Sequence, residues 1–199
     1  IVTASHNPAE YNGFKIAFDH GTIYGEQIQA LRRAIEEEEF ITDDEGKVSH
    51  KDIAGKYIDM ICKSITLTRP LKVGVDCGNG TASLFAQELL ERLGVQVHPI
   101  YCDSDPNFPN HFPDPVRPEN LQDLRSLVLE KELDLGIGFD GDGDRIGVVD
   151  DKGKIIYGDM LMVLFWREIL PKHPGALGIV EVKCSNALVE EIEKLGGKP

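Results

Sequence analysis

The spacing of apolar side chains follows two periods along the first third of the chain, and each period predicts one kind of element. Apolar residues recur at every second position over residues 14–18, with Lys15 on the opposite side, which predicts a short strand. They recur every three or four positions over residues 26–39 and again over 53–65, which predicts two amphipathic helices. Residues 42–52 are polar and rich in turn formers, so we expect a domain boundary there.

From residue 71 onward, short apolar runs alternate with helical spacing. The predicted order is strand 71–76, helix 81–93, strand 95–100, helix 119–132 and strand 133–139. Five prolines in residues 105–118 forbid a regular element there. This alternation is typical of an α/β layer fold with a largely parallel sheet, in which ligands bind at the carboxyl ends of the strands.

The last fifty residues repeat the pattern less completely. A strand from Ile146 leads to a hairpin turn, and Asp159 is expected to cap a helix that runs to about residue 170. Residues 176–182 predict another strand, and Ser185 is expected to cap the last helix. This strand-helix unit lacks a partner for its sheet, so we expect a further domain to begin here. We interpret the chain as part of a longer protein.

Composition excludes several classes of partner. The 199 residues are 41% hydrophobic and 28% charged, with a net charge of -13, which disfavours nucleic acid and anionic membranes as partners. No apolar run approaches a membrane span. The four cysteines form no Cys-x-x-Cys pair and no zinc spacing, so a reduced, cytoplasmic protein is expected.

Three carboxylates alternate with glycines in the run from Asp140 through Gly141, Asp142 and Gly143 to Asp144. Like charges this close repel and raise one another's pKa, so a bound cation is needed to neutralise them. Aspartate oxygens are the ligands that Mg2+ and Ca2+ prefer, and the glycines let the loop curl so that the side chains converge. A metal site is therefore the first hypothesis.

The flanks of this run favour a phosphate site over an EF-hand. Both flanks look like strands, whereas an EF-hand needs helices, and Arg145 and Asp151 stand where its Gly and Glu would be. Arg145 suits a phosphate substrate because its guanidinium binds phosphate oxygens bidentately. An acidic turn without a ligand is the alternative, although a turn alone requires neither three aspartates nor two glycines.

Gly78-Asn79-Gly80 follows a predicted strand and opens a predicted helix, as a dinucleotide-binding loop would. Ser83 stands where the third glycine of that motif would be, so a tight turn is the better interpretation. Five histidines lack the spacing of metal ligands and are interpreted as surface or structural residues: His20, His50, His98, His111 and His173.

The run from Thr3 to Pro8 is a second candidate site. Pro8 pushes Asn7 out of helical conformation, so the run is a strand end or an exposed loop. It would present the Ser5 hydroxyl, with His6 and Asn7 as polar neighbours. Taken alone this signal is weak, because a serine in such a turn usually has no chemical role.

Together the two runs resemble motifs of the α-D-phosphohexomutase superfamily. There, Thr-Ala-Ser-His-Asn-Pro carries a phosphoserine and Asp-Gly-Asp-Gly-Asp-Arg holds Mg2+. Residues 11–16 look like the segment that bears the family's catalytic lysine, here Lys15. Residues 110–115 and 118–121 are similar to the bacterial phosphomannomutase/phosphoglucomutase branch.

The resemblance implies a fold and a domain division. The fold would be α/β, with phosphohexomutase-type mixed domains and helices packed on both faces of a mostly parallel sheet. Residues 1–52 would be the C-terminal part of domain 1 with the phosphoserine loop. Residues 53–153 would be domain 2 with the metal loop, and residues 154–199 the start of domain 3.

The resemblance also implies an activity: transfer of a phosphoryl group between O1 and O6 of mannose or glucose phosphate through a hexose 1,6-bisphosphate. Ser5 would carry the phosphoryl group and offer an oxygen to the Mg2+ held by the three aspartates. Lys15 would be the general acid/base, although on spacing alone it is a solvated strand lysine. Arg145 would bind substrate, and His6 and Asn7 would shape the loop or bind substrate.

Two other classes stay open, a non-catalytic metal-binding domain and a metal-dependent sugar phosphatase. The partner would be a small hexose phosphate. The sequence leaves the oligomeric state, the choice between mannose and glucose, and activity without the rest of the family's domains open.

Overall fold

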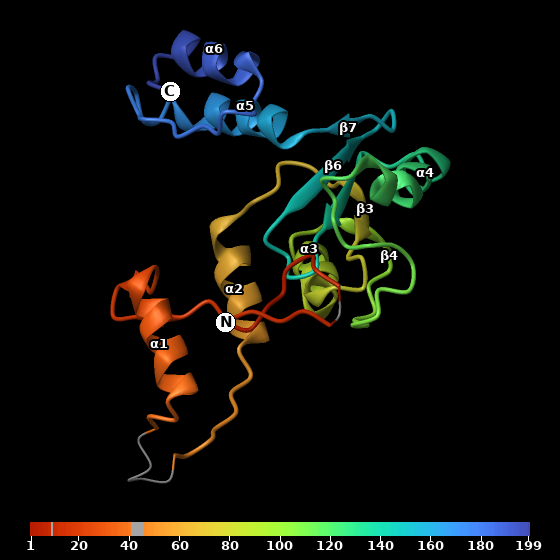
Figure 1. The fold of residues 1–199 in the computed structure, drawn as a ribbon. Coiled ribbons are helices and arrows are strands. Elements are labelled where there is room, and N and C mark those ends of the chain that lie inside the picture. Colours follow the sequence, from red (N-terminus) through yellow and green to blue (C-terminus); the bar gives the residue numbers. More distant parts are fainter. Residues whose placement is uncertain (9, 41–45) are drawn as a thin grey trace.

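A computed structural model describes residues 1–8, 10–40 and 46–199 (Figure 1). Part of the boundary expected at 42–52 lies outside these residues, and the described part, 46–52, is exposed and contains no helix or strand. Within the described ranges, no helix is both long enough and apolar enough to cross a membrane.

A five-stranded sheet forms the centre of the molecule, in the order β4-β3-β5-β6-β7. The strands are β3 (Lys72–Asp76), β4 (Gln96–Ile100), β5 (Leu135–Phe139), β6 (Ile146–Asp150) and β7 (Ile155–Ile156). The first three in the sheet are parallel, and β6 runs against both β5 and β7. Four of the five strands therefore point the same way, which makes the sheet mixed and mostly parallel.

Helices cover both faces of this sheet (Figure 1). Helix α3 (Ala86–Arg92) packs on one face beside α2 (Ala54–Ser64), and the side chain of Val75 lies in that core. Helix α4 (Gln122–Glu130) packs on the other face, so close that a side chain at Gly74 would press on its leucines. The predicted α/β class is therefore observed.

Two predicted helices begin later than their apolar spacing indicates. Residues 81–93 divide into a 3-10 turn at Thr81–Leu84 and then α3, because Phe85 leaves helical conformation with φ −151°. Its ring packs edge-on against Tyr57 of α2, with ring centroids 5.2 Å apart. The helix predicted at 119–132 likewise opens with a 3-10 turn, Pro118–Leu121, before α4 begins.

The first part of the chain forms little regular sheet. Of the strand predicted over residues 14–18, only β1 (Ala17–Phe18) pairs as a strand, with β2 (Gly21–Thr22). Phe14 forms only an isolated bridge with Val2. The alternating apolar side chains are exposed in the described chain, so they bury no surface that would extend the strand.

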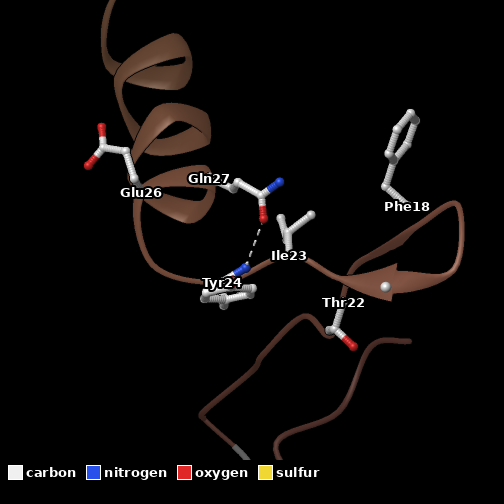
Figure 2. A pocket seen from close by; sticks show the side chains of 7 residues that line it. Phe18, Thr22, Ile23, Tyr24, Glu26 and Gln27 are labelled. Carbon is white, nitrogen blue, oxygen red and sulfur yellow. Dashed lines mark hydrogen bonds between the residues drawn. The ribbon is translucent and has the colours of Figure 1, made fainter.

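Helix α1 (Glu26–Glu36) follows β2, as its spacing predicts. An open hollow of about 470 Å³ lies between the hairpin and the start of this helix, where the Tyr24 amide donates to the Gln27 side chain over 3.3 Å (Figure 2). Among the described residues that line it, Glu26 is the one charged side chain. This hollow therefore offers no cation for a phosphate group.

Helices α5 (Gly158–Ile169) and α6 (Asn186–Lys194) pack on each other at the end of the chain, apart from the sheet (Figure 1). The strand predicted over residues 176–182 is wrong, because the structure has there only a single bridge between Leu177 and Lys198. Apolar residues in an extended run become a strand only when a neighbouring strand takes up their hydrogen bonds.

The capping predictions for these helices have different outcomes. Ser185 caps α6, as predicted, and its hydroxyl accepts a hydrogen bond of 3.2 Å from the Ala187 amide. The prediction for Asp159 is wrong, because the cap of α5 is Tyr157. The Asp159 carboxylate lies in the first turn and accepts from the Met160 and Ser185 amides, so it links the two helices.

Candidate active site

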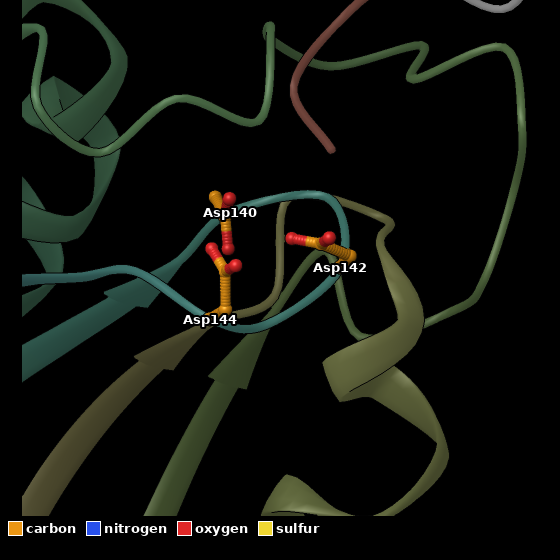
Figure 3. Close-up of side chains that lie close together, drawn as sticks. All are labelled: Asp140, Asp142 and Asp144. Atoms are coloured by element: carbon orange, nitrogen blue, oxygen red, sulfur yellow. The ribbon is translucent and has the colours of Figure 1, made fainter. Parts of the chain in front are cut away.

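The three aspartates lie on the loop between β5 and β6, at the carboxyl end of β5. Oxygens of Asp140, Asp142 and Asp144 all lie within 4.8 Å of one another, and Figure 3 shows their carboxylates turned toward a common point. Gly143 takes a left-handed conformation with φ +73°, and the Arg145 amide donates to the Asp140 carboxylate over 3.0 Å. The loop therefore closes on itself and gathers the carboxylates.

The environment of these carboxylates fits a bound cation. Asp140 is completely buried, and burial together with the charges of Asp142 and Asp144 raises its pKa. Burial opposes the charged form of Asp142 too, but the hydrogen bond from Thr3 and the charge of Lys15 hold its pKa below the ordinary value. Oδ1 of Asp142 is buried and has no hydrogen-bond partner among the described residues. An unpaired buried oxygen in a carboxylate cluster suits a hard divalent cation such as Mg2+.

The loop near the amino end meets the aspartate loop directly. The Ser5 hydroxyl lies 3.3 Å from Oδ2 of Asp140, across 135 residues of sequence. The Thr3 hydroxyl donates to Oδ2 of Asp142 over 2.8 Å. A side chain at Gly141 would collide with the carbonyl oxygen of Ser5, so the glycine allows the two loops to approach this closely.

Ser5 occupies a constrained turn. Its φ is +54°, which is uncommon for a residue with a side chain, and its amide donates to the Thr3 hydroxyl over 2.8 Å. Nδ1 of His6 lies 3.3 Å from the Ser5 hydroxyl oxygen. Asn7 closes the turn through its amide, which donates to the Ala4 carbonyl over 3.0 Å, and it lines the same pocket as Ser5. The predicted presentation of the serine is therefore observed.

Two cationic side chains border the cluster. Nζ of Lys15 lies 3.4 Å from Oδ2 of Asp144 and 3.8 Å from Oδ2 of Asp142. Backbone hydrogen bonds in both directions between Lys15 and Ile1 hold the lysine in place. Nε of Arg145 lies 3.9 Å from Oδ2 of Asp140, and this side chain is partly exposed. Both cations are positioned to receive an anionic group at the cluster.

The turn at residues 78–80 supports the aspartate loop from the side of β3. Gly78 and Asn79 both have positive φ, of +50° and +59°, so this is a tight turn. The Thr81 amide donates to the Gly141 carbonyl over 3.0 Å. A Cβ on Gly80 would lie 2.8 Å from that same oxygen. Gly80 is therefore needed because backbone meets backbone here, a role that the sequence analysis did not foresee.

A second support comes from the proline-rich loop. Nε2 of His111 lies 2.9 Å from the carboxylate of Asp76, which is almost wholly buried at the end of β3. Nδ1 of His111 lies 2.9 Å from the Phe112 carbonyl. Pro113 then contacts the positions where side chains at Gly78 and Gly141 would lie. His111 is thus structural, and it anchors a loop that packs against the site.

An open pocket of about 360 Å³ runs along the contact between the two loops. Its lining includes Thr3, Ser5 and Asn7 from the first loop and Asp142 from the second. The hydroxyl of Ser5, the carboxylates and the flanking cations together can hold a metal ion and an anionic substrate. Such a set is suited to phosphoryl transfer, in which charge stabilisation and positioning supply most of the acceleration.

The sequence matches family models over most of its length. Residues 55–153 match phosphoglucomutase/phosphomannomutase, alpha/beta/alpha domain II, and residues 1–42 match alpha/beta/alpha domain I of the same family. The fold and the site thus define a member of the α-D-phosphohexomutase superfamily. Within it, the chain belongs to the phosphoglucomutase/phosphomannomutase family.

Named relatives agree with this assignment. The phosphomannomutase/phosphoglucomutase of Pseudomonas aeruginosa is 48% identical, and the phosphoglucomutase of Neisseria gonorrhoeae is 43% identical; each match covers 100% of this chain and 43% of the relative. A crystal structure of a phosphoglucomutase/phosphomannomutase family protein from Burkholderia thailandensis matches with a TM-score of 0.94 at 45% identity, covering 100% of this chain and 43% of that one. The chain therefore spans less than half the length of these relatives.

Proposed function

We propose that the full-length protein is a hexose-phosphate mutase that moves a phosphoryl group between O1 and O6 of mannose or glucose phosphate. Ser5 would carry the phosphoryl group, and a hexose 1,6-bisphosphate would be the intermediate. Relatives named phosphomannomutase/phosphoglucomutase support the class of reaction. We propose the domain limits expected from the sequence: residues 1–52, 53–153 and 154–199.

The observation that carries this proposal is the contact between the Ser5 hydroxyl and the Asp140 carboxylate, 3.3 Å apart and 135 residues apart in sequence. A covalent carrier needs a nucleophilic oxygen, and phosphorylation attaches to that oxygen a group with a charge of about −2. Such a group is stable only beside cations. A serine on an ordinary surface turn has no reason to lie against a cluster of three carboxylates, one of which is completely buried.

Each neighbouring side chain has a defined task in the transfer. The phosphorylated Ser5 donates its phosphoryl group to a sugar hydroxyl and recovers one from the other end of the bisphosphate. Lys15 takes the proton from the attacking hydroxyl and returns one to the departing oxygen. Arg145 holds phosphate oxygens with its guanidinium fork. His6 orients the Ser5 oxygen from 3.3 Å, and Asn7 lines the substrate side of the pocket.

Asp140, Asp142 and Asp144, with an oxygen of the phosphorylated Ser5, would hold Mg2+. When bound, the ion supplies positive charge that offsets the charge on the transferring group. Asp142→Asn is expected to weaken Mg2+ binding about tenfold or more, because it removes a charged ligand. Asp151→Asn, on the exposed turn after β6, is the matched control. Equal Mg2+ affinity for both variants in calorimetric titration would remove Asp142 from the ligand set.

Ser5→Ala in the full-length protein tests the carrier directly. We expect activity with glucose 1-phosphate to fall by several orders of magnitude, and a phosphate adduct seen in the intact mass of the unmodified protein to disappear. Ser64→Ala is the control, because among the described residues that hydroxyl bonds only within its own helix, to the Ile61 carbonyl. A near-normal rate for Ser5→Ala would overturn the proposal.

The same assay separates the two other classes. A phosphatase would release inorganic phosphate from the sugar, whereas a mutase conserves it and is activated by hexose bisphosphate. A non-catalytic metal-binding domain would bind Mg2+ but carry no adduct on Ser5. The mutase is favoured over both because the hydroxyl lies against the metal cluster and Lys15 lies beside it.

A further inference from the structure

Two cysteines that are distant in sequence lie together just beyond the ends of β3 and β4. The sulfur atoms of Cys77 and Cys102 are 3.2 Å apart, and the two residues are 25 positions apart in sequence. Cys77 is completely buried, and Cys102 is partly exposed. The spacing of the cysteines gave no reason to expect a pair, so the contact is a product of the fold.

The strand register explains why the two thiols meet. Asp76 and Ile100 are neighbours at the ends of the parallel strands β3 and β4, so the next residues of both strands leave the sheet side by side. Tyr101 has a φ of +53°, which turns the chain sharply. Cys102 therefore points back over the strand end, with its sulfur 3.2 Å from the Ile100 carbonyl and 3.2 Å from the sulfur of Cys77.

We propose that Cys77 and Cys102 form a modification site, at which a small-molecule disulfide such as oxidised glutathione converts the thiol pair into an intramolecular disulfide. A disulfide has an S–S bond of about 2.05 Å, and the two sulfur atoms are already 3.2 Å apart. The sulfurs therefore need only to approach each other, mainly by side-chain rotation, and the strands stay in place.

Two exchange steps produce this bond, and every atom is accounted for. The Cys102 thiol loses its proton, and the thiolate attacks one sulfur of the oxidised glutathione. This step forms a mixed disulfide and releases one glutathione thiolate, which takes up a proton. The sulfur of Cys77 then attacks the Cys102 sulfur and expels the second glutathione. The proton of the Cys77 thiol goes to that leaving thiolate. One glutathione disulfide is reduced to two glutathione thiols as the protein pair is oxidised.

The environments of the thiols set the order of these steps. The hydrogen bond shared with Cys77 lowers the pKa of Cys102, and this side chain is the accessible one. The same hydrogen bond, together with burial, raises the pKa of Cys77. Cys102 is therefore the attacking residue, and Cys77 resolves the mixed disulfide from the interior.

The thiol pair adjoins the turn that supports the proposed active site. Cys77 precedes the turn at residues 78–80, which contacts the aspartate loop through Thr81 and Gly141. The disulfide would tie the ends of β3 and β4 together at the base of this turn. Formation of this disulfide depends on the thiols and the fold, so its test is independent of the mutase proposal.

The test is incubation of the reduced, folded full-length protein with oxidised glutathione, followed by alkylation, digestion and mass spectrometry. We expect a linked Cys77–Cys102 peptide and an intact mass lower by two hydrogen atoms, both reversed by dithiothreitol. Linkage should be about tenfold or more faster than adduct formation at Cys62 or Cys184, because the resolving thiol is already in place. Those two cysteines are the internal controls.

Single variants test the order of attack. Cys77→Ser should accumulate a stable glutathione adduct on Cys102, whereas Cys102→Ser should leave Cys77 unmodified. If Cys77 and Cys102 both stay free while Cys62 and Cys184 react, the proposal is wrong. An adduct on Cys77 in Cys102→Ser as fast as that on Cys102 in Cys77→Ser would overturn the assigned roles. Peptide mapping of the protein without substitutions shows whether the Cys77–Cys102 disulfide forms, even if a variant fails to fold.

Discussion

Gly80→Ala tests whether backbone contact between two loops positions the metal cluster. Gly80 has φ −82° and ψ −169°, an extended conformation that alanine adopts without strain. Its new Cβ would lie 2.8 Å from the Gly141 carbonyl oxygen, 3.0 Å from the Gly141 Cα and 3.1 Å from the Asp140 carbonyl oxygen. All three neighbours are backbone atoms, so no flexible side chain can move away.

The size of the effect follows from these distances. Ordinary van der Waals contact begins at 3.4 Å, whereas the new Cβ would lie 2.8 Å from the Gly141 oxygen. The aspartate loop would therefore have to move by 0.6 Å to remove the overlap. Overpacking of this kind costs about 1–3 kcal/mol of stability. Changes in groups that orient metal ligands weaken metal binding by about 10–100-fold, and a misplacement near 1 Å can cost about 100-fold in rate. We therefore expect about tenfold weaker Mg2+ binding and about tenfold lower kcat, since the shift is smaller than 1 Å.

Mg2+ titration by calorimetry and unfolding in urea measure the two effects separately. Gly55→Ala is the matched control, because a Cβ there meets none of the described residues within 4 Å and Gly55 lies in helix α2. That variant should bind Mg2+ normally and be as stable or slightly more stable, by up to about 1 kcal/mol. A folded Gly80→Ala variant with unchanged Mg2+ affinity and unchanged kcat would refute the reasoning.

Two further substitutions test groups that only the structure identified. Thr3→Val removes the hydroxyl that donates to Asp142, so it should weaken Mg2+ binding about tenfold. Thr3→Ser keeps a hydroxyl and should bind Mg2+ normally, and equal Mg2+ titration curves for the two variants would contradict this role. His111→Asn leaves the buried Asp76 carboxylate without its cation and should lower the free energy of unfolding by about 3–5 kcal/mol in urea titrations. Burial by itself lowers the pKa of His111, but the hydrogen bond and charge of Asp76 outweigh it and raise that pKa above 6.5. The stabilising contribution is therefore complete below pH 6.5 and is lost as the pH rises through the folded pKa, so the difference between His111→Asn and the unmodified protein should shrink above that pH; a difference that grows instead would contradict the ion pair.

The central sheet could be predicted from short-range patterns. The strands expected at 71–76, 95–100 and 133–139 all form, and each is shortened by only one or two residues at its start. These runs are bounded by glycine, proline or polar turns, and β3 and β5 are largely buried between helices, whereas β4 is a half-exposed edge strand. Burial and local preference therefore favour the same structure in the middle of the sheet. The run at 176–182 has similar composition but only a single bridge, because strand formation also requires a partner at its edge.

Local spacing predicted the candidate site only as two separate pieces, and it was the resemblance to the phosphohexomutases that predicted that Ser5 and the aspartates share one metal ion. The aspartate run and the serine run were visible as motifs, and Lys15 and Arg145 were assigned to them. Thr3 lies inside the quoted motif, but its hydrogen bond to Asp142 could not be foreseen. Contacts of this kind depend on which residue of one loop faces which residue of another, and no local spacing encodes that.

The sequence by itself determined which chemistry is available: carboxylates close enough to require a cation, and a hydroxyl presented by a proline-bounded turn. Local spacing fixes such features because they depend only on charge repulsion and backbone preference over a few residues. The tertiary structure alone decided that the hydroxyl lies 3.3 Å from Asp140 and that Cys77 meets Cys102. The Ser5 contact comes from the packing of the first loop on the aspartate loop, whereas the cysteine contact follows from the strand order β4-β3-β5-β6, which puts the ends of β3 and β4 side by side. That order is set by the burial of both sheet faces against helices, a property of the whole chain.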